Sequence, residues 1–281
     1  MTINLEKNSV MTFKKIFIIL GLTYATFAAS AQLSQSFINQ NAWLNSTITW
    51  SISPKWSIYQ EVQWRRNDYF NFPQQTLLRG GLTRDIGSGL SATAGYAYVH
   101  TSAYGTIPSK AAFDEHRVWQ QLQQKNTHSK FEFTTRLRME QRWVETPAAV
   151  HINNVQFQPN EFIYTYRARF MEKVNIALYS KDAAFKDNCL YLSMMDECFA
   201  SFGTNVTSNI FDQNRAFIGL GYIIPKIGRL EVGYLNQTIN KGYSNLEENG
   251  VSRILNKREV NHTLSVSLFT TIKTWKEEKN N

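Results

Sequence analysis

The sequence predicts an all-β protein: a transmembrane, antiparallel up-and-down β-barrel of about twelve strands, preceded by an N-terminal signal peptide. Three observations predict it: a short apolar segment near the N-terminus, a two-residue alternation of apolar and polar side chains, and short turns that alternate with long connections. Of the 281 residues, 43% are hydrophobic and 14% aromatic, which is too many for a disordered chain. No series of runs of about 20 apolar residues occurs, so a helical membrane protein is excluded.

The N-terminal segment has the features of an export signal. Lys14 and Lys15 precede a mostly apolar run over residues 16–27. Ala29 and Ala31 then stand in the small-x-small arrangement that signal peptidase requires. The apolar run of about 12 residues is shorter than a bilayer span, and no cysteine follows the cleavage point to carry a lipid.

Export decides which partners are expected. Cleavage after Ala31 leaves a signal peptide over residues 1–31 and one barrel domain over residues 32–281, located in the outer membrane. An exported protein meets no cellular nucleic acid. The net charge of +8 at pH 7 is therefore interpreted as a surface facing outer-membrane lipid and lipopolysaccharide, or as local charge pairs. No cofactor is expected.

Alternation with a period of two residues dominates the mature chain and predicts strands with one apolar and one polar face. Between Phe131 and Trp143, Phe133 and Leu137 lie on the apolar face, whereas Arg136 lies on the other. An amphipathic helix would scatter these two sets. The segments interpreted as strands are 42–52, 56–66, 75–86, 90–101, 114–125, 129–144, 161–179, 188–199, 212–224, 229–239 and 257–270.

The connections between these segments alternate in length. Turn residues occupy 53–55, 86–89, 125–129 and 225–228, and longer connections occupy 66–74, 102–113, 145–160, 200–211 and 240–256. A β-sandwich has no reason for this order, but an outer-membrane barrel has tight turns at one rim and long loops at the other. The pattern gives eleven strands, whereas bacterial barrels have an even number. We therefore expect about twelve, with either a short strand near Leu33–Gln40 or an N-terminal stretch that rises through the lumen.

Alternation alone fits a soluble β-protein equally well, so the membrane is inferred from further features. These are the signal peptide, strands of about 11 residues that cross a hydrocarbon layer at a tilt of about 45°, and aromatic residues near strand ends that predict interfacial girdles. The aromatic residues are Trp43, Trp50, Trp56, Trp64, Trp143, Tyr164, Tyr222 and Tyr234. A soluble exported β-protein is the alternative.

If the apolar faces meet lipid, the charged faces line one modest lumen. The expected lumen-lining residues are Glu61, Arg65, Arg79, Arg136, Arg138, Glu140, Arg142, Arg167, Arg169, Arg215 and Glu231. Two interpretations follow: a salt-bridged plug that holds the shape of the barrel, or a charged constriction that selects small anionic solutes. The expected function is that of a narrow or plugged pore or a structural barrel.

The sequence predicts no catalytic residues and no metal site. The spacing of its five histidines does not suggest a set of metal ligands. Outer-membrane phospholipases carry a Ser-His-Asn site that faces lipid, so His262 is considered with Ser265 or Ser267. Both serines are an odd number of residues from His262 and therefore point to the opposite face. We expect no enzyme, and a lipid hydrolase with a serine from a neighbouring strand is the alternative.

The chain has two cysteines, Cys189 and Cys198, which excludes a disulfide scaffold. Their separation of nine residues corresponds to about 30 Å in one straight strand, whereas a disulfide needs Cα atoms within about 7 Å. The exported compartment is oxidising. We therefore expect either a disulfide through a bend or hairpin, or two unpaired thiols.

Several segments resemble a known family. They are Phe211-Asp212-Gln213-Asn214-Arg215, Gly219-Leu220-Gly221-Tyr222 and Glu231-Val232-Gly233-Tyr234-Leu235-Asn236-Gln237, supported by Trp43-Leu44-Asn45, the stretch 136–142, Asp196-Glu197, Phe199, Phe202 and Gly203. Together they resemble domain-of-unknown-function family 2490; the stretch 181–198, which is longer and carries both cysteines, departs from its pattern. The resemblance implies an outer-membrane β-barrel of Gram-negative bacteria and no established activity. Gly219, Gly221 and Gly233 suit positions where a large inward side chain needs space or the sheet bends.

Overall fold

A computed structural model describes residues 34–180, 185–206, 210–248 and 251–275. The expected signal peptide and its cleavage site lie outside these residues. The described part of the chain consists of strands and their connections. It contains no helix that is long and apolar enough to cross a membrane.

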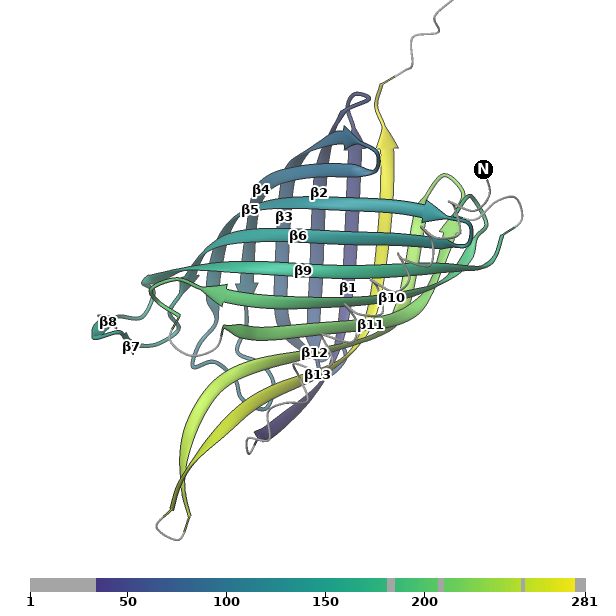
Figure 1. The fold of residues 1–281 in the computed structure, drawn as a ribbon. Coiled ribbons are helices and arrows are strands. Elements are labelled where there is room, and N and C mark those ends of the chain that lie inside the picture. The colour runs from purple at the N-terminus through teal and green to yellow at the C-terminus, as the bar shows by residue number, and fades with distance from the viewer. Residues whose placement is uncertain (1–33, 181–184, 207–209, 249–250, 276–281) are drawn as a thin grey trace, which may run out of the picture. The chain divides into compact units, whose positions relative to one another are not determined.

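Eleven strands of the described residues close into one barrel, in the order β1-β13-β12-β11-β10-β9-β6-β5-β4-β3-β2 (Figure 1). The barrel strands are β1 (Ser34–Ser51), β2 (Trp56–Asn67), β3 (Phe72–Gly87), β4 (Leu90–Thr101), β5 (Phe113–His128), β6 (Phe131–Glu145), β9 (Phe162–Tyr179), β10 (Leu190–Phe202), β11 (Phe211–Ile224), β12 (Gly228–Glu248) and β13 (Val251–Lys273). Two short strands, β7 (Val150–Ile152) and β8 (Val155–Phe157), pair with each other between β6 and β9. The predicted all-β barrel is confirmed, with eleven strands among the described residues where about twelve were expected.

The barrel closes where its first and last strands meet, and this closing pair is parallel. An odd number of strands joined by antiparallel pairs leaves the first and the last pointing the same way. The side-chain hydrogen bonds between β1 and β13 agree, because Asn39 bonds Asn261 and Asn45 bonds Ser267, each 222 residues further along the chain. Figure 1 shows β1 in purple beside β13 in yellow. Residues 34–40, the described part of the expected additional strand, belong to β1.

The connections follow the predicted alternation in length only in part. The connection expected over residues 66–74 spans only residues 68–71, as short as the turn between β1 and β2, and β9 and β10 are separated by residues 180–189 where the alternation requires a short turn. Short turns follow β1, β3, β5 and β11, whereas β4 and β5 are separated by residues 102–112 and β6 and β9 by residues 146–161. The prediction of a long connection over residues 240–256 was wrong. In its place β12 continues to Glu248 and β13 begins at Val251.

The chain divides into two compact units, which are described separately. The smaller unit comprises residues 1–35 and 243–256, and its described part consists of the first two residues of β1 and the adjoining ends of β12 and β13. The larger unit comprises Ser36–Gly242 and Lys257–Asn281 and is called the barrel body here. The following sections concern the barrel body alone.

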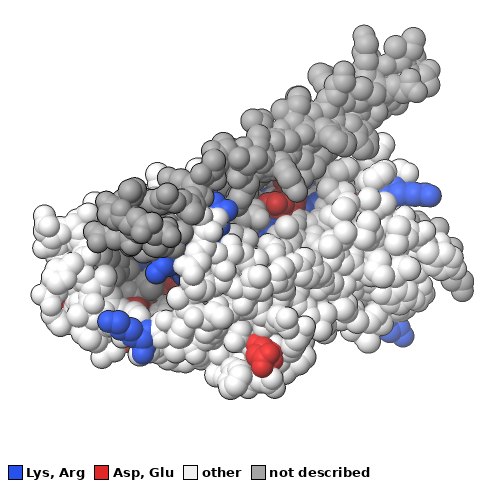
Figure 2. All heavy atoms as spheres, turned by 90° about the horizontal axis from the view of Figure 1, so that it is seen from below, with Lys and Arg blue, Asp and Glu red and all other residues white. Residues whose placement is uncertain are grey.

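The barrel body carries its large apolar side chains on the outside. In β3, Leu78 and Leu82 are each 47% exposed, whereas the alternating Leu77 and Arg79 are 2% and 6% exposed. The same alternation leaves Val62, Leu122, Leu137, Ile218, Leu220, Val232 and Leu264 exposed on the outer face. The outer surface seen in Figure 2 accordingly shows few charged side chains. This inverts the usual order of a water-soluble fold.

Two glycine sites explain how the sheet accommodates its inward side chains. Tyr191 is fully buried and lies over Gly221, where an added Cβ would overlap the tyrosine ring. Gly219 pairs with Gly233 on the next strand, where a Cβ on Gly219 would come within 2.8 Å of the Cα of Gly233. Gly221 therefore makes room for an inward ring, and the other two allow a close approach of two backbones.

Candidate functional site

The barrel body encloses a cavity of about 970 Å³, lined by residues of all eleven barrel strands. At one end its lining includes Lys226 and Ile227 of the turn between β11 and β12. At the other end it includes Tyr104, Ile107 and Ser109 of the connection between β4 and β5. The cavity is therefore the lumen of the barrel, and it extends from the turn rim towards the loop rim.

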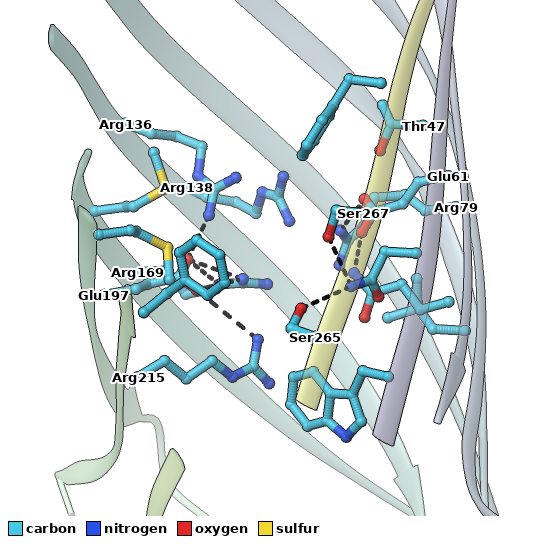
Figure 3. A pocket seen from close by; sticks show the side chains of 18 of the residues that line it. Thr47, Glu61, Arg79, Arg136, Arg138, Arg169, Glu197, Arg215, Ser265 and Ser267 are labelled. Atoms are coloured by element: carbon cyan, nitrogen blue, oxygen red, sulfur yellow. Dashed lines mark hydrogen bonds and ion pairs between the residues drawn. The ribbon is translucent and has the colours of Figure 1, made fainter. Parts of the chain in front are cut away.

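The structure places ten of the eleven residues expected in the lumen on the wall of this cavity. They are Glu61, Arg65, Arg79, Arg136, Arg138, Arg142, Arg167, Arg169, Arg215 and Glu231. The eleventh, Glu140, lies behind this wall with a side chain that is 0% exposed, and it accepts a hydrogen bond from Arg169 Nη1 at 2.8 Å. Figure 3 shows Arg136, Arg138, Arg169 and Arg215 projecting from one wall, with Glu61 and Arg79 on the other.

Glu197 on β10 is a lumen carboxylate that two arginines share. Arg169 donates to it from Nε and Nη2, at 3.0 Å each, in the two-pronged geometry that makes arginine–carboxylate pairs strong. Arg136 Nη2 donates to the same carboxylate at 2.5 Å. Sequence reasoning did not assign Glu197 to the lumen, although it alternates with outward residues of β10.

Glu140 lies at the centre of four guanidinium groups. The nearest nitrogen atoms are 2.8 Å away in Arg169, 3.7 Å in Arg117, 3.8 Å in Arg79 and 3.9 Å in Arg138. One buried carboxylate therefore balances the charge of several arginines at once. Such a network costs desolvation free energy and fixes the geometry of the wall.

Charge pairs near the turn rim join strands that are not neighbours. Glu132 on β6 accepts from Arg229 on β12 at 2.5 and 3.0 Å. Lys173 on β9 donates to Glu231 on β12 at 2.6 and 2.7 Å. Because β12 is not adjacent to β6 or β9 in the sheet, these pairs cross the lumen and narrow it. Of these four residues, sequence reasoning assigned only Glu231 to the lumen.

Aromatic rings lie among the arginines of the lumen. Arg65 Cζ is 3.9 Å from the ring centroid of Trp43, and Arg138 Cζ is 4.8 Å from that of Trp119. Trp43 was expected in an outer girdle, but it is only 3% exposed and lines the lumen. It shares its face of β1 with Asn41 and Asn45, and this two-residue period is the signal that could have placed it inside.

The connection over residues 102–112 is tied into the loop end of the lumen. Tyr104 donates its hydroxyl proton to Glu259 Oε1 at 3.0 Å, and the backbone N–H of Thr106 donates to Asn39 Oδ1 at 3.0 Å. Burial raises the pKa of the Tyr104 phenol above its usual value, and the Glu259 carboxylate beside it adds to this. Lys241 Nζ also lies 2.7 Å from Glu259.

Cations outnumber carboxylates in the lumen. Ten arginines and four lysines line the cavity, against six carboxylates from Glu61, Glu115, Glu132, Asp187, Glu197 and Glu231. Three further carboxylates, Glu140, Asp212 and Glu259, bond to arginine or lysine without lining the cavity. The described wall therefore keeps a positive excess, which attracts anions.

The residues weighed for lipid hydrolysis do not come together. His262 accepts or donates a hydrogen bond at Nδ1 with the Tyr234 hydroxyl at 2.5 Å on the outer face. Ser265 and Ser267 line the lumen and accept hydrogen bonds from Asn45 at 3.5 and 3.0 Å.

Among the described residues, no group of three or more His, Cys, Asp or Glu side chains is arranged to hold a metal ion.

The two cysteines are free thiols. Cys189 is buried just before β10 and Cys198 is half-buried within that strand. The disulfide alternative is therefore not formed, because the intervening residues run along an extended strand. Of the two expectations, the structure has the unpaired thiols.

Comparison with known proteins gives a family but no activity. An uncharacterized protein of Methylorubrum extorquens is 27% identical over 233 residues, covering 81% of this chain and 85% of that relative. No solved structure matches. The family described as "Protein of unknown function (DUF2490)" matches residues 40–247, which is well over half of the chain. This confirms the resemblance in the sequence, and the chain belongs to the DUF2490 family.

Proposed function

We propose that this protein is an outer-membrane β-barrel that conducts small anions through a narrow, arginine-rich lumen, and that it is not an enzyme. The observation that carries the proposal is the charge of the lumen wall. Fourteen cationic side chains line the cavity against six carboxylates, and the lining includes residues near both rims. Rings of fixed arginine charge select anions in pores.

The outer face supports the membrane part of the proposal. Large apolar side chains such as Leu78, Leu82 and Leu220 are about half exposed around the barrel body. A soluble monomer rarely leaves so continuous an apolar surface in water. The exposed Trp64, Trp143 and Tyr166 lie near the loop ends of their strands, as does the half-buried Tyr164, and interfacial girdles are found at such positions.

A plugged structural barrel is the second candidate, favoured by specific contacts. The pairs Glu132–Arg229 and Lys173–Glu231 cross the lumen, and Tyr104 holds the connection over residues 102–112 against Glu259. In a plugged barrel these contacts would hold the wall together without leaving a path for ions.

Planar-bilayer recording separates the two candidates. The mature protein is inserted into a bilayer between KCl solutions of unequal concentration, and the reversal potential is measured. A pore with this wall gives discrete current steps, and its reversal potential is shifted from zero towards the equilibrium potential of chloride. A reversal potential shifted towards the equilibrium potential of potassium would contradict the proposal. The absence of any conductance would favour the plugged barrel.

Two further measurements test the location and the absence of catalysis. The proposal expects the protein in the outer-membrane fraction and aggregation of the purified chain when detergent is removed. It also expects no release of fatty acid from phospholipid vesicles by the wild-type protein. Release that His262→Ala abolishes would instead support a lipid hydrolase.

A further inference from the structure

Most lumen arginines are matched by a carboxylate among the described residues. Glu61 bonds Arg79, Glu115 bonds Arg117 and Arg142, Glu197 bonds Arg136 and Arg169, Asp212 bonds Arg167, and Glu132 bonds Arg229. In the described part of the chain, three lumen arginines form no ion pair shorter than 3.5 Å: Arg65, Arg138 and Arg215. The side chain of Arg138 is 1% exposed, lies 3.9 Å from Glu140 and donates two hydrogen bonds to Gln121. Arg65 and Arg215 line the cavity as Arg138 does, but they are less buried: Arg65 is 6% exposed and the side chain of Arg215 is 13% exposed.

Arg65 and Arg215 lie against the same indole ring. The ring centroid of Trp43 is 3.9 Å from Arg65 Cζ and 5.2 Å from Arg215 Cζ. The two guanidinium carbons are therefore no further apart than the sum of these distances. They belong to β2 and β11, so segments far apart in the sequence bring two positive charges to one aromatic ring.

The polar partners of these two arginines are neutral amides. Arg65 donates from Nε to Gln63 Oε1 at 3.0 Å and from Nη1 to Gln75 Oε1 at 2.5 Å. The Gln213 amide, oriented to accept, lies 2.7 Å from Arg215 Nε. The nearest carboxylate to Arg215 is Glu197 at 3.8 Å, and that group is already bonded to two other arginines. Amides orient the guanidinium groups without neutralising them.

Two such charges are costly in a narrow lumen. Arg65 is 6% exposed, and the side chain of Arg215 is 13% exposed, so bulk water solvates neither well. A protein that keeps a buried charge usually supplies a counter-charge. Among the described residues, no ion pair joins Arg65 to a carboxylate, and the one carboxylate near Arg215, Glu197 at 3.8 Å, is shared with two other arginines. Both arginines line the cavity.

We propose that Arg65 and Arg215, with Trp43 between their strands, form a binding site for a small oxyanion such as phosphate. Guanidinium groups bind phosphate and carboxylate oxygen atoms through two parallel hydrogen bonds, which gives them preference over chloride. The amides of Gln63, Gln75 and Gln213 hold the guanidinium planes in place. The site rests on the proposed anion-conducting lumen for its access and adds a preferred class of solute.

Isothermal titration of the detergent-solubilised mature protein with inorganic phosphate, in a chloride-free buffer, tests the site. Wild-type protein is expected to bind phosphate, and Arg65→Gln and Arg215→Gln are each expected to weaken binding at least about tenfold. Arg65→Lys keeps the charge but loses the paired donors, so it is expected to bind with intermediate affinity. Arg84→Gln, an exposed arginine outside the lumen, is the matched control and is expected to bind like wild type. Succinate in place of phosphate tells whether carboxylates share the site.

The outcomes distinguish this site from the pore. If Arg65→Gln and Arg215→Gln fold, as judged by their circular dichroism, and bind phosphate like wild type, the site is refuted. Chloride conductance without phosphate binding refutes the site and leaves the pore intact. Phosphate binding that depends on both arginines, in a barrel that does not conduct, supports the site and refutes the pore.

Discussion

Asn39 and Asn261 join the first and last strands of the barrel through a buried side-chain hydrogen bond, in which Asn39 Nδ2 donates to Asn261 Oδ1 at 3.0 Å. The other side-chain atom of Asn39, Oδ1, accepts from the backbone N–H and the hydroxyl of Thr106 at 3.0 and 3.1 Å. One amide therefore links the parallel seam to the connection that enters the lumen. A barrel with an odd number of strands needs such links, because parallel pairing is slightly less stable per residue.

Asn39→Ala should loosen the seam and the connection together. The change leaves the buried Oδ1 of Asn261 without its donor, which costs about 1–3 kcal/mol. It also removes both hydrogen bonds that the exposed Thr106 donates to Asn39. We expect a lower free energy of unfolding in urea and faster proteolysis within residues 102–112. Asn126→Ala, at an exposed position of β5, is the control. Equal cleavage rates in the two variants would contradict the role of Asn39.

Glu197→Gln should weaken the barrel and raise its preference for anions. The carboxylate is 3% exposed and is bonded to both Arg136 and Arg169. Removing one partner of a buried ion pair costs roughly 3–5 kcal/mol, and losing a negative charge increases the positive excess of the wall. Thermal unfolding in detergent and the reversal potential in a KCl gradient measure the two effects. Glu161→Gln, exposed in the connection before β9, should change neither.

The strands and the facing of their side chains could be predicted because both depend on one local period. β9 was expected over residues 161–179 and spans Phe162–Tyr179. Within β6, Arg136 and Arg138 point inward because they alternate with Leu137, which is 46% exposed. Parity along an extended strand is fixed by the backbone, so no long-range information was needed.

The closing seam and the charge pairs could not be predicted, because they depend on distant strands. That Arg229 meets Glu132, 97 residues away, follows from the closure and stagger of the whole sheet. The continuation of β12 and β13 left a local signal that was missed. Asn249-Gly250, a common hairpin dipeptide, stands between their ends in the sequence, whereas residues 240–256 were interpreted as one long connection.

Gly221→Ala should destabilise the barrel through a clash with Tyr191. The added Cβ would overlap the tyrosine ring, which is fully buried and donates to Glu231 Oε1 at 3.0 Å. Overpacking of this kind costs about 1–3 kcal/mol. In a Tyr191→Leu background the same glycine change should cost much less, and a double-mutant cycle in urea unfolding measures the difference. Additive effects of the two changes would show that the ring is not the obstacle.

The attachment of Tyr104 to Glu259 should persist below about pH 10 and weaken above it. Burial and the neighbouring carboxylate raise the pKa of the folded phenol above the value of 10.0 that applies to an unperturbed tyrosine. As pH rises past 10, the unfolded or detached phenol loses its proton first, so the free energy that holds the connection falls with further increase in pH. Proteolysis within residues 102–112 should therefore accelerate between pH 9 and about pH 11 in wild type.

Tyr104→Phe lacks the ionisable group. Its cleavage should be faster than that of wild type at pH 9 and should increase less as the pH rises. Tyr69→Phe, at an exposed position between β2 and β3, should follow the wild-type profile. A Tyr104→Phe profile with the same pH-dependence as wild type would show that another group governs the connection.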